Sequence, residues 1–183
     1  PALRHEMREQ VGRLLRAEGV SAVLVTHDRS EALGLADRVA VMRAGVVLQC
    51  DTPEGLYFRP ESPEAAALSG DVQYLEAVIE GETAATALGR LRLARPAAAG
   101  PARVLVRPDW ILPCDDGVPG LVMERLVEGA LTRLRVELAS GVQVSVATAS
   151  GWLARTGETV RLGVAVAVTA FQAEHASAGT EIP

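Results

Sequence analysis

The spacing of hydrophobic residues predicts how the first part of the chain folds. In residues 3–17 hydrophobic side chains recur at helical intervals, and Gly19 stands where a left-handed cap would end a helix. The continuous apolar run of residues 22–25 is typical of a strand buried on both faces. Asp28, with a glutamate three residues later, fits a capping box that opens a short helix. We therefore expect His27 between a strand and a helix.

Two more strands and two more helices are predicted next. Residues 39–42 and 46–48 have the composition of strands, and Ala44-Gly45 predicts a tight turn between them. Thr52 and Ser62 each precede a proline and a glutamate, which is the pattern of an N-cap followed by the first helical turn.

Beyond residues 59–62, which have the character of a linker, helical alternation disappears at about Leu68. Short β-rich runs separated by glycine or proline follow, and they predict a small all-β barrel or sandwich. Residues 94–101 are expected to form a loop. The runs cover residues 72–80, 86–93, 103–106, 121–127, 131–138, 142–147 and 160–171.

One hairpin is predicted in detail. Ala139-Ser140-Gly141 separates two alternating runs, which is a strong hairpin signal. In the run 131–138 the side chains of Arg133, Arg135 and Glu137 should share one face, and the apolar residues between them should share the other.

Composition and charge argue against a nucleic-acid-binding protein and against a membrane-spanning one. The 183 residues carry a net charge of -5 and 3% aromatic residues, which argues against a nucleic-acid-binding surface. No apolar run reaches the length of a spanning helix, and the start is not signal-like, so we expect a cytoplasmic protein. Cys50 and Cys114 are far apart, and neither a disulfide nor a metal site is expected.

The basic residues exclude one catalytic element. All 18 are arginines, because the sequence contains no lysine. A phosphate-binding loop needs a lysine on the β- and γ-phosphates, so these residues cannot supply that loop.

His27 is the main candidate for a catalytic residue. A histidine beyond the carboxyl end of a strand in an open α/β sheet can hydrogen-bond a phosphate or an attacking water. From position alone, a structural hydrogen-bonding role is the commoner one. For Asp28, helix capping is preferred to a metal role, because no second carboxylate stands at ligand spacing.

Residues 23–32, Val-Leu-Val-Thr-His-Asp-Arg-Ser-Glu-Ala, closely resemble the switch-histidine segment of ABC transporter ATPases. The resemblance continues through residues 35–42, 51–54 and 57–60, as at the end of the nucleotide-binding domain of importer-type members. Residues 1–4 resemble the stretch that follows the family's D-loop. Several elements in this order make a specific match.

The second half resembles the TOBE-like accessory β domain of such importers, a fold related to the oligonucleotide-binding barrel. Its marks are residues 106–109 and 157–163. The resemblance implies an α/β remnant of a P-loop ATPase domain (residues 1–65), a TOBE-like or MOP-like β domain (66–173) and a flexible tail (174–183). The order of short motifs looks most like the ferric-iron importers.

The resemblance also implies chemistry and partners. His27 would contact the γ-phosphate, while ATP and Mg²⁺ would be cofactors of the intact subunit but not of these residues alone, which should be inactive. Partners would be membrane permease subunits, a second ATPase subunit and, indirectly, a solute-binding protein, at the inner face of the membrane.

Arg107 and Asp109 are the candidates for a regulatory site, since some accessory domains of this type bind small anions. The family usually has glutamate where Asp109 stands. The alternative is that the two residues pair with each other or with the backbone to fix a loop. For the scattered aromatic residues a packing role is favoured: Tyr57, Trp110, Trp152 and Phe171.

Two other functions remain open. The β half could act alone as a small-anion sensor, or it could serve only as a dimerisation module. The first sixty-odd residues are expected to supply strands to a larger parallel sheet, and without that sheet they should expose an apolar helix face and unpaired strand edges. The β half should be the more autonomous folding unit.

Overall fold

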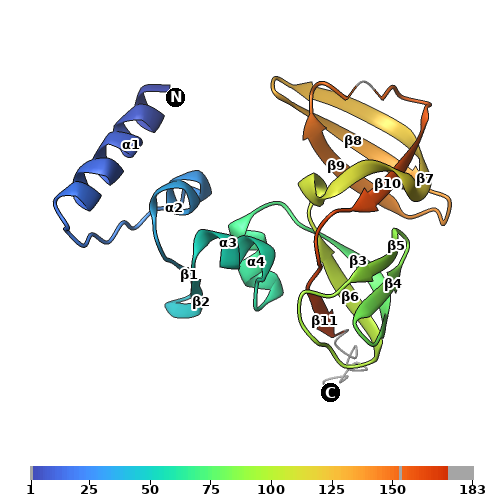
Figure 1. Cartoon of the computed structure of the whole chain (residues 1–183), viewed down its shortest axis with the longest axis horizontal. Coiled ribbons are helices and arrows are strands. Elements are labelled where there is room, and N and C mark those ends of the chain that lie inside the picture. Colours follow the sequence, from blue (N-terminus) through green and yellow to red (C-terminus); the bar gives the residue numbers. More distant parts are fainter. Residues whose placement is uncertain (1, 153, 173–183) are drawn as a thin grey trace, which may run out of the picture. The chain divides into compact units, whose positions relative to one another are not determined.

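The chain divides into two compact units, Pro1–Gly70 and Asp71–Pro183, in a computed structural model that describes residues 2–152 and 154–172. Figure 1 shows the α-helices in the first unit and strands β3 to β11 in the second. Helix α4 (Pro63–Ser69) runs across the expected boundary at residues 65 and 66. The expected tail of residues 174–183 lies outside the described residues.

Helix α1 (Ala2–Ala17) forms where periodicity predicted it. Gly19 takes the left-handed conformation with φ of 63°. Its N–H donates to the carbonyl of Arg16 at 3.3 Å, and the N–H of Val20 donates to that of Leu15 at 3.0 Å. These two bonds make a Schellman motif, which satisfies carbonyls that the helix end leaves without partners.

The prediction of a strand at residues 22–25 was wrong. This segment is irregular, and the side chains of Val23 and Val25 are 94% and 92% exposed. Within the described residues, its backbone pairs with no other strand. A sequence suited to burial on both faces forms a strand only when neighbouring strands supply hydrogen bonds and cover.

The other predicted elements of the first unit are confirmed. Helices α2 (Arg29–Leu35), α3 (Pro53–Phe58) and α4 begin after the predicted N-caps Asp28, Thr52 and Ser62. Strands β1 (Val39–Arg43) and β2 (Val46–Asp51) pair in an antiparallel hairpin. Ala44 and Gly45 both have positive φ, 50° and 80°, as a tight hairpin turn requires.

The first unit has a small core and a large exposed apolar surface. Leu56, Ala65 and Ala66 are fully buried where α3 and α4 meet. By contrast, the apolar face of α1 is exposed through Met7, Val11 and Leu14, at 57%, 52% and 61%. The predicted exposure of this face is confirmed.

The second unit consists of two antiparallel sheets. The described strands are arranged as a four-stranded sheet in the order β10-β7-β8-β9 and a five-stranded sheet in the order β11-β6-β3-β4-β5. The predicted all-β architecture of this half is confirmed. The strands are β3 (Gln73–Glu80), β4 (Thr83–Thr86), β5 (Gly89–Arg92), β6 (Gly100–Val106), β7 (Ile111–Glu128), β8 (Leu131–Leu138), β9 (Gln143–Ala149), β10 (Thr159–Val164) and β11 (Ala170–Gln172).

Several strand bounds differ from the prediction. The expected run 160–171 is interrupted between β10 and β11, and β4 lies in a stretch for which the pattern predicted nothing before residue 86. Gly100 and Pro101, expected in a loop, begin β6. Strand β7 starts ten residues early, because its pairing to β10 jumps from Pro119 to Pro113 and the irregular residues between them hid the strand signal.

Both sheets contribute to one hydrophobic core. It joins Leu75 and Val104 of the five-stranded sheet with Val122, Val136 and Val146 of the four-stranded sheet. In β8 the predicted alternation is confirmed: every second residue from Thr132 is buried, and Arg133, Arg135 and Glu137 face the other way. The packing roles predicted for two tryptophans hold, since Trp110 is 3% exposed and Trp152 packs against the core.

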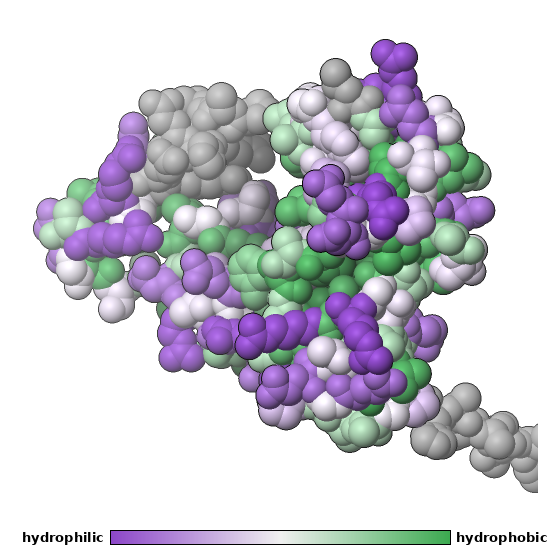
Figure 2. Space-filling model, turned by 45° about the vertical axis from the view of Figure 1, so that its right-hand side comes forward, coloured by the Kyte–Doolittle hydropathy of each residue, from purple (hydrophilic) through white to green (hydrophobic). Residues whose placement is uncertain are grey.

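Apolar residues also reach the surface of the molecule. Figure 2 shows hydrophobic patches interspersed with hydrophilic ones on the visible face. None of the helices within residues 2–152 and 154–172 is long and apolar enough to cross a membrane.

Candidate functional site

His27 lies on a bend between the exposed segment 22–25 and the start of α2, and its side chain is exposed. The residues on either side fix this bend. The N–H of Asp28 donates to Oγ1 of Thr26 at 3.0 Å, and that hydroxyl donates to the carboxylate of Glu31 at 2.5 Å. The Thr26 hydroxyl thus links the N-cap residue to the first turn of the helix.

The carboxylate of Asp28 completes the cap. Its Oδ1 accepts hydrogen bonds from the backbone N–H of Ser30 at 2.8 Å and of Glu31 at 3.3 Å. The predicted capping role of Asp28 is therefore confirmed. With both neighbours held in this way, the exposed imidazole of His27 is available to donate or accept a hydrogen bond at a phosphate oxygen.

Two features bear on whether the first unit could hold ATP or a metal. The sequence has no lysine for the phosphates. Among the described residues, no group of three histidine, cysteine, aspartate or glutamate side chains is placed to hold a metal ion. His27 offers one hydrogen-bonding contact, whereas phosphoryl transfer needs several groups that position and stabilise charge.

In the second unit, Arg107 and Asp109 differ sharply in burial. Arg107 is 0% exposed, and its guanidinium lies 5.6 Å from the ring centre of Trp110. Nη1 of Arg107 donates to the carbonyl of Asp71 at 3.1 Å, whereas Asp109 is exposed. This geometry favours the alternative in which Arg107 pairs with the backbone to fix a loop.

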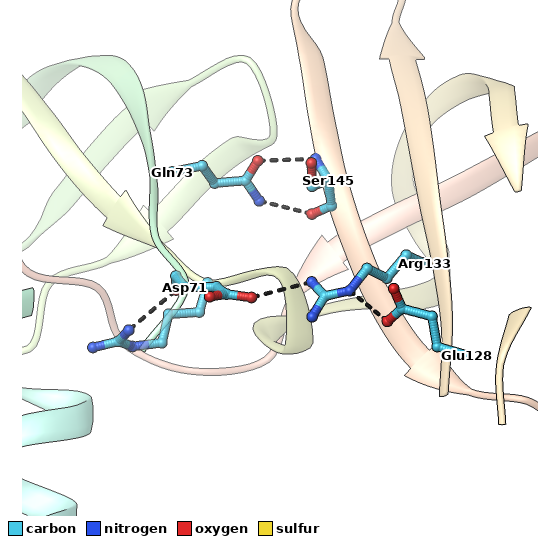
Figure 3. Close-up of polar contacts among 6 residues, drawn as sticks. Asp71, Gln73, Glu128, Arg133 and Ser145 are labelled. Carbon is cyan, nitrogen blue, oxygen red and sulfur yellow. Dashed lines mark hydrogen bonds and ion pairs between the residues drawn. The ribbon is translucent and has the colours of Figure 1, made fainter. Parts of the chain in front are cut away.

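Through its bond to Asp71, Arg107 joins a larger polar group, the junction cluster, made of Asp71, Gln73, Arg107, Glu128, Arg133 and Ser145. Figure 3 shows the other five members. Arg133 lies between two carboxylates, 3.2 Å from Asp71 and 2.8 Å from Glu128. The hydrogen bond and charge of Glu128, followed by those of Asp71, raise the pKa of Arg133 above its ordinary value. The cluster therefore ties the first residue of the second unit to β7 and β8.

Gln73 makes the other link of the junction cluster. Its side-chain amide donates to the carbonyl of Ser145 at 2.8 Å and accepts from the N–H of Ser145 at 2.9 Å (Figure 3). A side chain of β3 in one sheet thus replaces the backbone of a missing neighbour strand at the edge of β9 in the other sheet. Gln73 could not be predicted from the sequence, because a single glutamine in an alternating strand carries no signal of a partner 72 residues away.

Comparison with known proteins gives matches in both halves of the chain. Residues 104–171 match the family model of the TOBE domain. The chain is 40% identical over 141 residues to the Fe(3+) ions import ATP-binding protein FbpC of Pseudomonas fluorescens, which covers 74% of this chain and 40% of that protein.

Two further relatives match over more of the chain. The FbpC protein of Serratia marcescens is 36% identical over 168 residues, covering 88% of this chain and 48% of that protein. The sulfate/thiosulfate import ATP-binding protein CysA of Xanthomonas campestris is 38% identical over 163 residues, covering 87% of this chain and 48% of that protein. The chain thus spans less than half the length of these relatives.

A solved structure of the cytoplasmic molybdate-binding protein ModG, with molybdate bound, aligns with 55% of this chain and 96% of that chain at a TM-score of 0.47 and 13% identity. A similarity at this level carries no argument about function. In sequence, the chain is similar to the ATP-binding subunits of ABC importers, and its residues 104–171 match the TOBE domain.

Proposed function

We propose that this chain is part of an ATP-binding subunit of an ABC importer, in which the first unit carries the switch histidine and the second is the accessory β domain. The observation that carries the proposal is sequence identity of 36–40% to three import ATP-binding proteins over 74–88% of the chain. The matched segment includes both units in two of these relatives, whose matches exceed the length of the second unit alone.

In this proposal the first unit is the carboxyl-terminal remnant of a P-loop ATPase domain. The exposed apolar face of α1 and the unpaired segment 22–25 support it, because both have the composition of surfaces that a larger sheet would cover. His27 at the end of this segment would contact the γ-phosphate of ATP. Asp28 and Thr26 would position the imidazole by holding the bend.

The residues of this chain are not sufficient for hydrolysis. ATP and Mg²⁺ belong to the intact subunit, which supplies the phosphate loop that a chain without lysine cannot form. The 183 residues alone are therefore inactive. Titration of the purified chain with ATP and magnesium in a calorimeter tests this, and we expect no heat of binding up to millimolar nucleotide.

The intact subunit would act with a second ATPase subunit and with permease subunits at the inner face of the membrane. The transported solute would be a small one, with ferric iron favoured, since two of the three relatives described above are named for Fe(3+) import. The sulfate/thiosulfate relative makes sulfate the competing solute. Uptake of radioactive iron or sulfate distinguishes them.

A chimera tests the function directly. The amino-terminal part of the Serratia marcescens protein, up to the point where the match begins, would be joined to this chain. We expect the purified chimera to hydrolyse ATP, because the relative supplies the phosphate loop and this chain supplies the switch histidine. A folded chimera that binds ATP but hydrolyses none would contradict the proposal. Limited proteolysis of this chain alone should leave a stable β unit beginning near residue 65.

A further inference from the structure

Arg125 on β7 points toward the inner face of its sheet, which is unusual for a charged side chain. It stands opposite Leu134 of β8, which in turn stands opposite Val146 of β9, and both apolar partners are buried. Residues directly opposite each other on neighbouring strands project to the same side. The stem of Arg125 therefore lies on the side of the sheet that forms the core.

The guanidinium of Arg125 has no counter-charge in the described part of the chain. Its Nε is buried and lacks a hydrogen-bond partner, and among the described residues the side chain forms no ion pair. On the opposite face of the same hairpin, Arg133 and Arg135 are paired with Glu128 and Glu124 at 2.8 and 3.0 Å. A buried donor without an acceptor is costly, so its persistence calls for an explanation.

The backbone next to Arg125 is also unpaired on one side. Strand β7 pairs with β10 only over residues 111–121, and residues 157 and 158 add bonds to Val122. Over residues 123–128 the described structure gives β7 hydrogen bonds to β8 alone. Figure 1 shows β7 and β8 as neighbouring strands of this hairpin. Within the described residues this edge is unpaired, and an unpaired edge of this length can accept an added strand.

The side chains around this edge are apolar and exposed. Met123, Leu126 and Val127 are 43%, 54% and 53% exposed, and Leu131 across the hairpin is 47% exposed. A small anion on Arg125 would leave these side chains in water, whereas a peptide would cover them. Val127 shares the face of Arg125, whereas Leu126 and Leu131 stand opposite Arg133 and Glu128 on the other face, so an added strand would cover apolar side chains on both faces.

We propose that the edge of β7 at residues 123–128 binds an extended segment of another protein as an added antiparallel strand, with a carboxylate opposite Arg125. A residue in that position of the added strand would have its Cβ about 5 Å from that of Arg125. A glutamate there reaches the guanidinium, and the paired charges form strong hydrogen bonds. The backbone bonds supply affinity, and the carboxylate selects the sequence and register of the partner.

Nuclear magnetic resonance titration of the ¹⁵N-labelled full chain tests the proposal. The probe is a blocked heptapeptide of alternating valine and glutamate, used at millimolar concentration. We expect shifts centred on residues 123–128, and binding weaker by about tenfold for Arg125→Gln, because a charge-assisted hydrogen bond is lost. Arg135→Gln, on the opposite face, is the matched control and should bind as the wild type does.

Two probes keep the test independent of the folding of the variant. With the wild-type chain, a peptide carrying glutamine in place of glutamate should bind about tenfold more weakly. A peptide with N-methylated amides on the pairing edge should not bind, because it cannot form the ladder.

Three results would overturn the proposal. The first is no binding of the acidic peptide, and the second is equal binding by Arg125→Gln. The third is that acetate or phosphate alone gives the same shifts and displaces the peptide, which would mean a small-anion site. The last alternative is that a second copy of this chain occupies the edge. Sedimentation measures the oligomeric state, and a dimer that disappears in Arg125→Gln would show this alternative to be correct and the proposal wrong.

Discussion

Replacing Gln73 with alanine tests whether its amide holds the two sheets of the second unit together. The change removes two hydrogen bonds to Ser145, of 2.8 and 2.9 Å. A hydrogen bond contributes about 0.5–1.5 kcal/mol net, so the pair contributes about 1–3 kcal/mol. Because both bonds are exposed to solvent, we expect the lower part of this range, about 1–2 kcal/mol.

The assay is urea unfolding followed by tryptophan fluorescence. Both tryptophans, Trp110 and Trp152, belong to the second unit, so the signal reports on that unit. For a domain of this size, a loss of about 1–2 kcal/mol in the free energy of unfolding would also lower Tm by roughly 5–15 °C in a thermal scan. Gln143→Ala is the matched control, since Gln143 makes a single exposed contact of 3.2 Å with Glu137 and should change stability by less than about 0.5 kcal/mol.

The substitution Gln73→Glu adds a pH dependence. The carboxylate can accept from the N–H of Ser145 but repels its carbonyl oxygen, which raises the pKa of the introduced glutamate in the folded state. A group whose pKa is raised on folding favours the folded state at low pH, and this contribution is lost as pH rises. The defect should therefore shrink as pH falls below about 5. If Gln73→Ala and Gln143→Ala unfold at the same urea concentration, the sheet-joining role of Gln73 is refuted.

Three further variants probe the close approach of β7 to β10 at Gly117, the N-cap of α2 and the junction cluster. Gly117→Ala should destabilise the second unit by at least about 1–3 kcal/mol, because a Cβ would lie 2.6 Å from the backbone N of Leu162, whereas Gly151→Ala, with open space around it, should be nearly neutral in the same urea assay. Asp28→Ala should cost about 1 kcal/mol and speed hydrogen exchange in α2, because two backbone donors lose their acceptor. Arg133→Gln should cost less than about 1 kcal/mol, with a smaller effect in high salt, because its ion pairs are exposed.

Local patterns predicted the capped helices well. Thr52, Ser62 and Asp28 cap their helices as the sequence indicates, and Gly19 ends α1. In each case the deciding interaction joins residues within a few positions of one another, so a short window contains the information. The alternation of β8 was predictable for the same reason.

Interactions between distant residues were not predictable. The strand expected at residues 22–25 depends on neighbours that the described residues do not provide. Gln73 meets Ser145 only after both sheets have formed, and Arg107 meets the carbonyl of Asp71 only after β3 and β6 have paired. The unpartnered state of Arg125 is likewise a property of the folded sheet, because nothing adjacent to it in the sequence marks its orientation.

Steady-state ATP hydrolysis by the chimera with and without His27 tests the central claim most directly. If this chain supplies the switch histidine, His27→Ala should abolish hydrolysis while ATP binding, measured by calorimetry, is retained. His5→Ala, a histidine outside the matched switch segment, serves as the control and should hydrolyse ATP at the rate of the unmodified chimera. Equal hydrolysis by the His27→Ala and unmodified chimeras would contradict the account.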